Sequence, residues 1–206
     1  QSKRQSTDKP MSLYISKLLR EATHLLTLDA SNLYLNDSDQ NNLYMGFSQN
    51  KTLKYLNLSG NQFSQSSFLI DGITKIPSYL NLNSCSISTQ SCITISTALS
   101  NGWSIISLDL SNNRIGSLGI SSLFNTLSTN ETLTTLNLSS NNFDSSIGPS
   151  LKKFMLANRV LSSLDISKNH LSDSIAIIFA ETLPSNESLS ELNLSTTWIT
   201  DSQIDR

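Results

Sequence analysis

The sequence predicts an α/β solenoid, in which short parallel β-strands line a concave face and α-helices cover the convex face. Three observations lead to this prediction. One short motif recurs along most of the chain, an asparagine follows most of its copies, and apolar residues at helical spacing come next. Internal repetition with a period of about 20–50 residues is typical of solenoid architectures.

The recurring motif predicts the strands. The copy LTTLNLSSNNF, which starts at Leu133, alternates apolar and polar residues with the period of two that marks a half-buried strand. The seven copies start 28, 24, 28, 28, 28 and 28 residues apart. We therefore expect seven strands, which start near residues 25, 53, 77, 105, 133, 161 and 189.

The ninth position of the motif explains how the chain turns after each strand. A buried turn leaves backbone donors and acceptors without partners, and an asparagine amide can bridge them because it both donates and accepts hydrogen bonds. We expect the residues at this position to form a structural ladder, with a cysteine in one copy that lacks the amide. The ladder residues are Asn61, Cys85, Asn113, Asn141 and Asn169.

The second half of each repeat predicts a helix. Apolar residues four apart, such as Leu123 and Leu127, mark one face of a helix. The same spacing, at Ile15 and Leu19, predicts a helix over residues 11–22. Residues that tolerate a positive φ precede most strands, and we expect them to end the helices in a left-handed conformation. These residues are Asn50, Gly102, Asn130, Asn158 and Asn186.

The repeats predict one domain. We expect a flexible tail over residues 1–10 and a single solenoid over residues 11–206. The shorter repeat, which starts at residue 53, predicts a shortened helix near residues 68–76. Solenoid ends need polar caps, and no dedicated cap is visible here. We therefore expect the chain to be part of a longer protein; the alternative is a short solenoid sealed by its own end helices.

The pattern L-x-x-L-x-L-x-x-N-x-L over residues 11–204 resembles the leucine-rich repeat family. A period of 28 residues with a helical second half is similar to the ribonuclease-inhibitor-like class of that family. The resemblance implies a horseshoe with parallel strands on its concave face. It also implies a non-catalytic scaffold for protein–protein interaction.

Composition excludes several other classes of function. The net charge is −2 and charged residues make up 15% of the chain, so we expect no nucleic-acid partner. No apolar run reaches about 18 residues, so we expect no membrane insertion. We expect a cytoplasmic protein, because Cys85 and Cys92 are typical of reduced thiols. We also expect a monomer.

Residue types that carry chemistry are few and scattered. His24 and His170 are about five repeats apart, and Cys85 and Cys92 lack the paired spacing of a zinc site. We therefore predict no catalytic residue, no metal site and no cofactor, and we do not expect an enzyme.

The concave face is the candidate binding surface. Tyr55 and Tyr79 fall at equivalent positions of adjacent strands, and aromatic residues often anchor interfaces. Asp29, Asp109 and Asp165 share another outward column and suit a basic partner. The predicted partner-binding residues are Lys54, Tyr55, Tyr79, Asp109, Asp165 and Glu191.

Three functions remain open from the sequence. The leading interpretation is a protein-binding scaffold, and the Ser- and Asn-rich composition favours a secreted bacterial effector that binds a host protein in the host cytoplasm. The second is a GTPase-activating protein resembling the Ran activators, which would either orient the catalytic groups of its partner or supply Arg114 from the rim. The third is a ligand-sensing or spacer region of a larger receptor.

Overall fold

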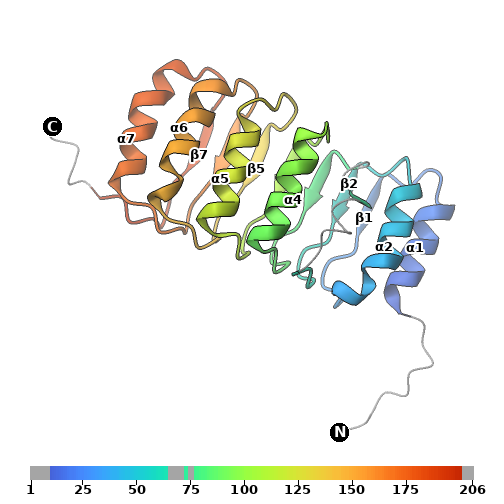
Figure 1. The fold of residues 1–206 in the computed structure, drawn as a ribbon. Helices are drawn as coiled ribbons and strands as arrows, with labels where there is room; N and C mark the ends of the chain where they lie inside the picture. The colour runs from blue at the N-terminus through green and yellow to red at the C-terminus, as the bar shows by residue number, and fades with distance from the viewer. Residues whose placement is uncertain (1–9, 65–71, 74–76, 201–206) are drawn as a thin grey trace, which may run out of the picture.

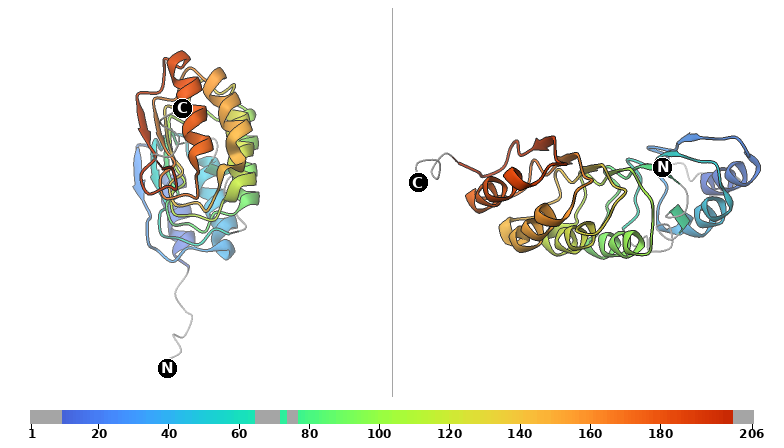
Figure 2. Two further views of the ribbon diagram at one scale, coloured as in Figure 1. Left: turned by 90° about the vertical axis from the view of Figure 1, so that its left-hand side faces the viewer. Right: turned by 90° about the horizontal axis from the view of Figure 1, so that it is seen from above.

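The computed structural model describes residues 10–64, 72–73 and 77–200, and it forms an open α/β solenoid (Figure 1). Seven parallel strands make one sheet in the order β1-β2-β3-β4-β5-β6-β7. The helices form a second layer along one side of this sheet, as the view from above shows (Figure 2). The predicted fold class is therefore confirmed.

Each repeat contributes one short strand and, in most cases, one helix. The strands are β1 (Thr27–Asp29), β2 (Tyr55–Asn57), β3 (Tyr79–Asn81), β4 (Ser107–Asp109), β5 (Thr135–Asn137), β6 (Ser163–Asp165) and β7 (Glu191–Asn193). The α-helices are α1 (Met11–Glu21), α2 (Gln40–Gln49), α4 (Thr89–Ser100), α5 (Gly116–Leu127), α6 (Gly148–Ala157) and α7 (Asp173–Thr182). Short 3-10 turns lie at Asp37–Asp39, Ser145–Ile147 and Leu183–Ser185.

Two expectations concern residues that the structure does not describe. The predicted shortened helix near residues 68–76 lies outside the described residues, apart from Gly72 and Ile73. The predicted tail over residues 1–10 lies outside them too, apart from Pro10.

The five inner strands each bury one residue in three, and the central residues of the edge strands β1 and β7 are half-buried. The middle residue of each strand points into the core, and Leu56, Leu108 and Leu136 are each exposed by no more than 2%. Adjacent strands pair in register, so that Leu56 is the backbone neighbour of Leu80, and Leu80 is that of Leu108. Because successive side chains of a strand point to opposite faces, the residues on either side of each leucine form straight columns on the concave face.

The asparagines at the ninth motif position lie inside the turns and are buried. Asn113 donates from Nδ2 to the carbonyls of Leu82 and Leu110 and accepts from the N–H groups of Cys85 and Ile87, at 2.8–3.0 Å. Asn61, Asn141 and Asn169 make equivalent bonds. We call these four residues the inner ladder; each ties its own turn to the preceding one.

Cys85 occupies the ladder position of the irregular repeat. Its thiol donates to the carbonyl of Leu58 at 3.1 Å, whereas the N–H of Phe63 bonds to the Cys85 backbone carbonyl at 2.8 Å. Burial raises the pKa of Cys85 to about 11, so the thiol keeps its proton at neutral pH. The thiol therefore supplies one donor where asparagine would supply two.

A second asparagine ladder corrects the prediction of left-handed helix ends. Gly102 has a positive φ of 91°, but Asn50, Asn158 and Asn186 are extended, with φ between −98° and −74°. The Nδ2 atom of each donates at 2.8 Å to a carbonyl near the end of the preceding repeat's helix. We call these three residues the return ladder.

The return ladder satisfies carbonyls that a helix leaves unpaired at its C-terminus. Leu127 is the last residue of α5, and its carbonyl accepts from Nδ2 of Asn158 at 2.8 Å in addition to the backbone N–H of Asn130 at 3.2 Å. Asn158 also accepts from the N–H groups of Val160 and Leu161 at 3.0 and 2.9 Å, which fixes the start of the next strand segment. Asn130 accepts in the same way from the N–H groups of Thr132 and Leu133, and it too lacks a positive φ.

Left-handed residues occur instead in the turns after the strands. The eighth motif position has a positive φ in every repeat, and the residue there is glycine only once. These residues are Asn32, Gly60, Ser84, Asn112, Ser140, Lys168 and Thr196. The tight turn into the helix layer imposes this conformation whatever the residue type, which is why composition did not reveal it.

Candidate functional site

The candidate site is a hollow on the concave face of β1 to β4. The strand pairing places Thr27, Tyr55, Tyr79 and Ser107 side by side in one row. A second row, two residues further along each strand, contains Asp29, Asn57, Asn81 and Asp109. These rows line a hollow of about 380 Å³, together with Leu28, Leu56 and Leu80. We call this the concave hollow.

Two stacked tyrosines form the centre of the concave hollow. The ring centroids of Tyr55 and Tyr79 are 4.4 Å apart, and the ring planes differ by 13°. Adjacent strands lie about 4.8 Å apart, so two aromatic residues in equivalent positions stack face to face. The Tyr55 side chain remains 45% exposed, and the row ends in smaller residues on both sides, Thr27 and Ser107.

Carboxylates lie at both ends of the second row. Asp29 accepts from the backbone N–H of Ser31 at 2.9 Å and from Nδ2 of Asn57 at 3.2 Å. Hydrogen bonds from Ser31, helped by Asn57, lower the pKa of Asp29, which is therefore ionised at neutral pH. Asp109 accepts from the backbone N–H and the hydroxyl of Ser111, both through Oδ1.

No lysine or arginine is among the residues that line the concave hollow. Lys54 precedes Tyr55 and is exposed, but it does not line the hollow. Oδ2 of Asp109 has no hydrogen-bond partner in the described part of the chain. The hollow therefore combines exposed aromatic surface with uncompensated negative charge.

The structure divides the residues that the sequence proposed for partner binding. Tyr55, Tyr79 and Asp109 lie together, whereas Asp165 in β6 and Glu191 in β7 lie further along the sheet, outside the concave hollow. Asp29 belongs with the first group although it was not among the six proposed residues. The sequence signal for Asp29 was its place at the fifth position of the motif, which Asp109 and Asp165 hold in their own repeats.

Asp165 is a close structural analogue of Asp29. It accepts from the backbone N–H of Ser167 at 2.9 Å and from Nδ2 of Asn193 at 2.9 Å. Two residues before Asp165, Ser163 occupies the position that Tyr55 and Tyr79 hold in their strands, and its neighbours across the sheet are Thr135 and Glu191. No aromatic ring therefore lies next to Asp165. This makes Asp165 a matched reference for the two aspartates of the hollow.

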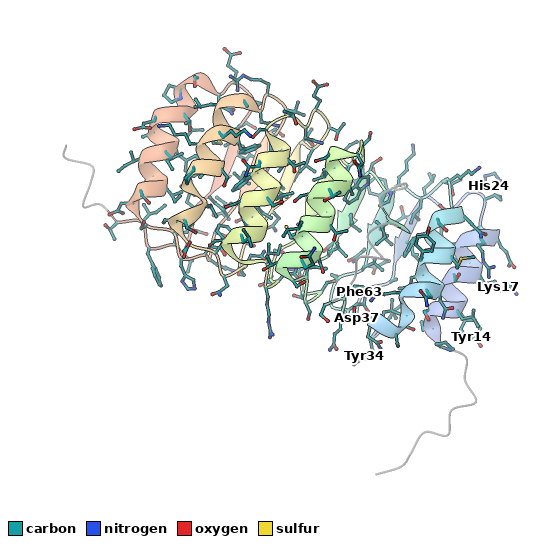
Figure 3. The ribbon with its side chains drawn as sticks, in the orientation of Figure 1. Tyr14, Lys17, His24, Tyr34, Asp37 and Phe63 are labelled. Carbon is teal, nitrogen blue, oxygen red and sulfur yellow. The ribbon has the colours of Figure 1, made fainter. Side chains whose placement is uncertain are left out.

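Other exposed surfaces are separate from this site. Tyr14 and Lys17 lie on the outer side of α1 at one end of the stack (Figure 3), where they help to line a shallow depression with a volume of about 500 Å³. His170 packs on Trp198 with ring centroids 4.6 Å apart, at the rim after β6 and β7. Both surfaces are formed by other elements than the strands that line the concave hollow.

The described residues contain no cluster of potential metal ligands, and both cysteine thiols are buried. Nowhere in residues 10–64, 72–73 and 77–200 do three His, Cys, Asp or Glu side chains converge as metal ligands. Burial also raises the pKa of Cys92, to about 12, so both thiols are protonated and shielded. In the same part of the chain, no helix has the length and apolarity needed to span a membrane.

Arg114 lies at the rim, after β4. Its backbone N–H bonds to the carbonyl of Ile87 at 3.0 Å, and its side chain is exposed. Among the described residues the guanidinium has no hydrogen-bond or ion-pair partner. It does not line the concave hollow.

Comparison with known proteins agrees with this architecture. A family model described as "Leucine Rich repeat" matches residues 49–65, 104–124, 129–150 and 157–180. No curated protein matches the chain significantly.

Solved structures with a similar fold include two proteins of low sequence identity. The leiomodin-1 Actin-Binding Site 2 is 21% identical with a TM-score of 0.53, over 62% of this chain and 72% of that one. The tropomodulin C-terminal domain of Caenorhabditis elegans is 12% identical with a TM-score of 0.54, over 84% of this chain and 92% of that one. The matched repeats, the parallel sheet and these shared folds together make the chain a member of the leucine-rich repeat family.

Proposed function

We propose that this chain is a non-catalytic protein-binding scaffold whose contact surface is the concave hollow. The observation that carries the proposal is the stacked pair Tyr55 and Tyr79, in which Tyr55 is exposed and Tyr79 is half-buried, between the smaller residues Thr27 and Ser107. Tyrosine is enriched at the energetic centres of interfaces because it offers a large rigid surface at a low entropic cost. Each ring here is further held by the other.

The solenoid supports the same role through its shape. Repeat stacks present extended curved surfaces, and a standard interface buries about 1,200–2,000 Å² in total. The inner ladder and the return ladder cross-link successive turns below the sheet, so the strands offer a preformed surface. A preformed surface binds with a lower entropic cost than one that must be ordered.

The identity of the partner is a separate question. The leiomodin structure is titled as an actin-binding site, but at this level of identity the likeness supports a shared fold and not a shared partner. We also propose that the chain belongs to the ribonuclease-inhibitor-like class. We further propose that residues 11 onwards form one monomeric solenoid within a longer protein, and that the partner is a host protein. The 28-residue spacing of paired strand residues and the α-helical return segments support the first of these.

A displayed library of random peptides tests the proposed surface. We expect wild-type protein to enrich binding sequences that the Tyr55→Ala/Tyr79→Ala variant no longer holds. The matched control is Leu118→Ala/Leu156→Ala, which removes exposed apolar side chains from helices on the convex side. Binding that survives the tyrosine changes but not the leucine changes would place the contact surface elsewhere.

A GTPase-activating role is the second candidate, because Arg114 has a free side chain at the rim. An arginine supplied to a GTPase can stabilise the charge that develops during hydrolysis. The test is GTP hydrolysis by a panel of small GTPases with wild-type protein and with Arg114→Ala. Stimulation that disappears in the variant would favour this role over the scaffold.

A further inference from the structure

We propose that the concave hollow binds an extended basic segment of a protein partner, with two cationic side chains held at opposite ends of the hollow. This inference rests on the proposed function and specifies its ligand. It follows from a repeated arrangement within the hollow. Each end joins the free face of a tyrosine ring to a carboxylate on the neighbouring strand.

The first end lies between β1 and β2. Tyr79 covers one face of the Tyr55 ring, so the other face is turned toward the side of Thr27. Asp29 follows on the same strand as Thr27, and it points to the same face of the sheet. A side chain that enters here meets a π face and a carboxylate together.

The second end lies between β3 and β4 and has the same composition. The free face of the Tyr79 ring is turned toward the side of Ser107, and Asp109 follows Ser107 on β4. Thr27 and Ser107 are both small, which leaves room beside each ring. Tyr55 and Tyr79 thus share one stacked pair and offer one free face to each end.

This combination selects for positive charge. The face of an aromatic ring attracts ammonium and guanidinium groups, and a carboxylate attracts them further. The residues lining the hollow include no lysine or arginine, so the two carboxylates have no cation of their own there. Asp29 is ionised at neutral pH, since its hydrogen bonds lower its pKa.

The separation of the two ends fits an extended chain. β1 and β4 are three strand steps apart, which is roughly 14 Å at about 4.8 Å per step. An extended peptide advances about 3.4 Å per residue, so side chains four residues apart are separated by a similar distance. Residues i and i+4 of an extended chain also point to the same side.

The middle of the hollow suits a peptide backbone. Asn81 accepts from the N–H of Asn83 at 2.8 Å through Oδ1, and its Nδ2 has no partner among the described residues. That amide N–H can donate to a carbonyl of the bound segment. A nucleic acid would bring phosphates against Asp29 and Asp109, so a basic protein segment is the occupant that the charges favour.

Binding of defined peptides tests the proposal. The probe is a nine-residue peptide of glycine and serine with arginines at positions 3 and 7, which are four residues apart, measured by fluorescence anisotropy. We expect it to bind wild-type protein. Replacing both arginines by glutamate should abolish binding, and moving them to positions 3 and 5 should weaken it.

Three single variants locate the contact. Asp29→Asn and Asp109→Asn keep an oxygen that can accept from Ser31 or Ser111, and each should weaken binding about fivefold, as expected for the loss of one partly exposed ion pair. Asp165→Asn is the matched control and should leave the affinity unchanged. An equal loss with Asp165→Asn would mean that only the overall charge matters, and would overturn the proposal.

Two further outcomes would also overturn it. One is equal binding by a peptide with neutral residues at both positions. The other is binding of spermidine as tight as that of the peptide, because the site would then recognise free polyamines. The displayed library separates this inference from the proposed function. If the enriched peptides require the tyrosines but show no excess of lysine and arginine, the concave hollow remains the proposed binding surface and the proposal of a basic ligand is wrong. If peptide binding does not depend on the tyrosines, both the proposed function and the basic ligand are wrong.

Discussion

The side-chain amide of Asn158 donates to the backbone carbonyl of Leu127 at 2.8 Å, although the two residues are 31 positions apart. Leu127 ends α5, and Asn158 follows the last residue of α6. The bond therefore ties the end of one helix to the return segment of the next repeat. Asn186 makes the same contact with Met155 one repeat later.

This contact predicts that the ends of α6 and α4 respond differently to substitution: Asn158 is needed for its side chain, and Gly102 for its positive φ. Asn158 has an extended backbone, so Asn158→Gly removes the side-chain bonds without relieving any strain. We expect the free energy of unfolding, measured by urea denaturation, to fall by about 1–3 kcal/mol because buried backbone groups lose their partners. A left-handed helix end would instead favour glycine. Unchanged stability in Asn158→Gly would contradict the return ladder.

Gly102 provides the complementary case. It has a φ of 91°, and no other group lies within 4 Å of where a Cβ atom would be added. We expect Gly102→Ala to lower the free energy of unfolding by about 1–2 kcal/mol, through backbone strain alone. Chemical denaturation of both variants in parallel gives the comparison. Full stability in Gly102→Ala would show that the positive φ is not required.

The inner ladder predicts a strong effect for one buried amide. Asn141 is fully buried and donates to the carbonyls of Leu110 and Leu138 at 2.8 and 3.1 Å. We expect Asn141→Leu to lower the free energy of unfolding by about 1–3 kcal/mol, because each carbonyl loses one of its two donors and the buried N–H of Ile115 loses its acceptor. The control is Asn125→Leu, an exposed asparagine on α5. A control as costly as Asn141→Leu would argue against a specific role of the ladder.

The tyrosine pair predicts a measurable coupling. A double-mutant cycle on Tyr55→Ala and Tyr79→Ala should give a coupling free energy of about 0.5–1.5 kcal/mol, because the rings stack face to face. The reference cycle combines Tyr55→Ala with Tyr14→Ala, which lies on α1 and is also exposed. That second cycle should be additive within about 0.5 kcal/mol. Additivity in both cycles would mean that the rings do not stack in solution.

The buried thiols predict a loss of stability in alkali. Burial raises the pKa of Cys85 from its ordinary value of 9.0 to about 11 and that of Cys92 to about 12. The unfolded chain releases these protons near pH 9 while the folded chain keeps them, so the stabilising contribution is complete below pH 9 and falls as the pH rises toward 11.

The measurement is the free energy of unfolding between pH 8 and pH 10. Between the pKa of the unfolded state and that of the folded state, each thiol should lower the free energy of unfolding by about 1.4 kcal/mol per pH unit. The Cys85→Ala/Cys92→Ala variant should lack this thiol-dependent loss of stability. Parallel pH profiles for the two proteins would show that the thiols are not buried in solution.

The repeat pattern was sufficient for the architecture because it encodes local physics. Alternation around Leu136 predicts a strand, and the pair Leu123 and Leu127 predicts a helix face, and both appear in the structure. The prediction was wrong at Asn50, Asn158 and Asn186, where a residue that tolerates positive φ was taken as a local helix end. The carbonyls that accept from their Nδ2 groups lie one repeat earlier, and a window of a few residues does not contain them.

The sequence by itself determined the period, the positions of the strands and the residues that face inward, because each follows from side-chain alternation and spacing within one repeat. Only the tertiary structure decided that Asp29 and Asp109 flank one tyrosine pair, and that Asp165 does not. Such groupings depend on how turns about 28 residues apart pack against each other. The pairing between strands, rather than any single strand, places these side chains within reach of one ligand.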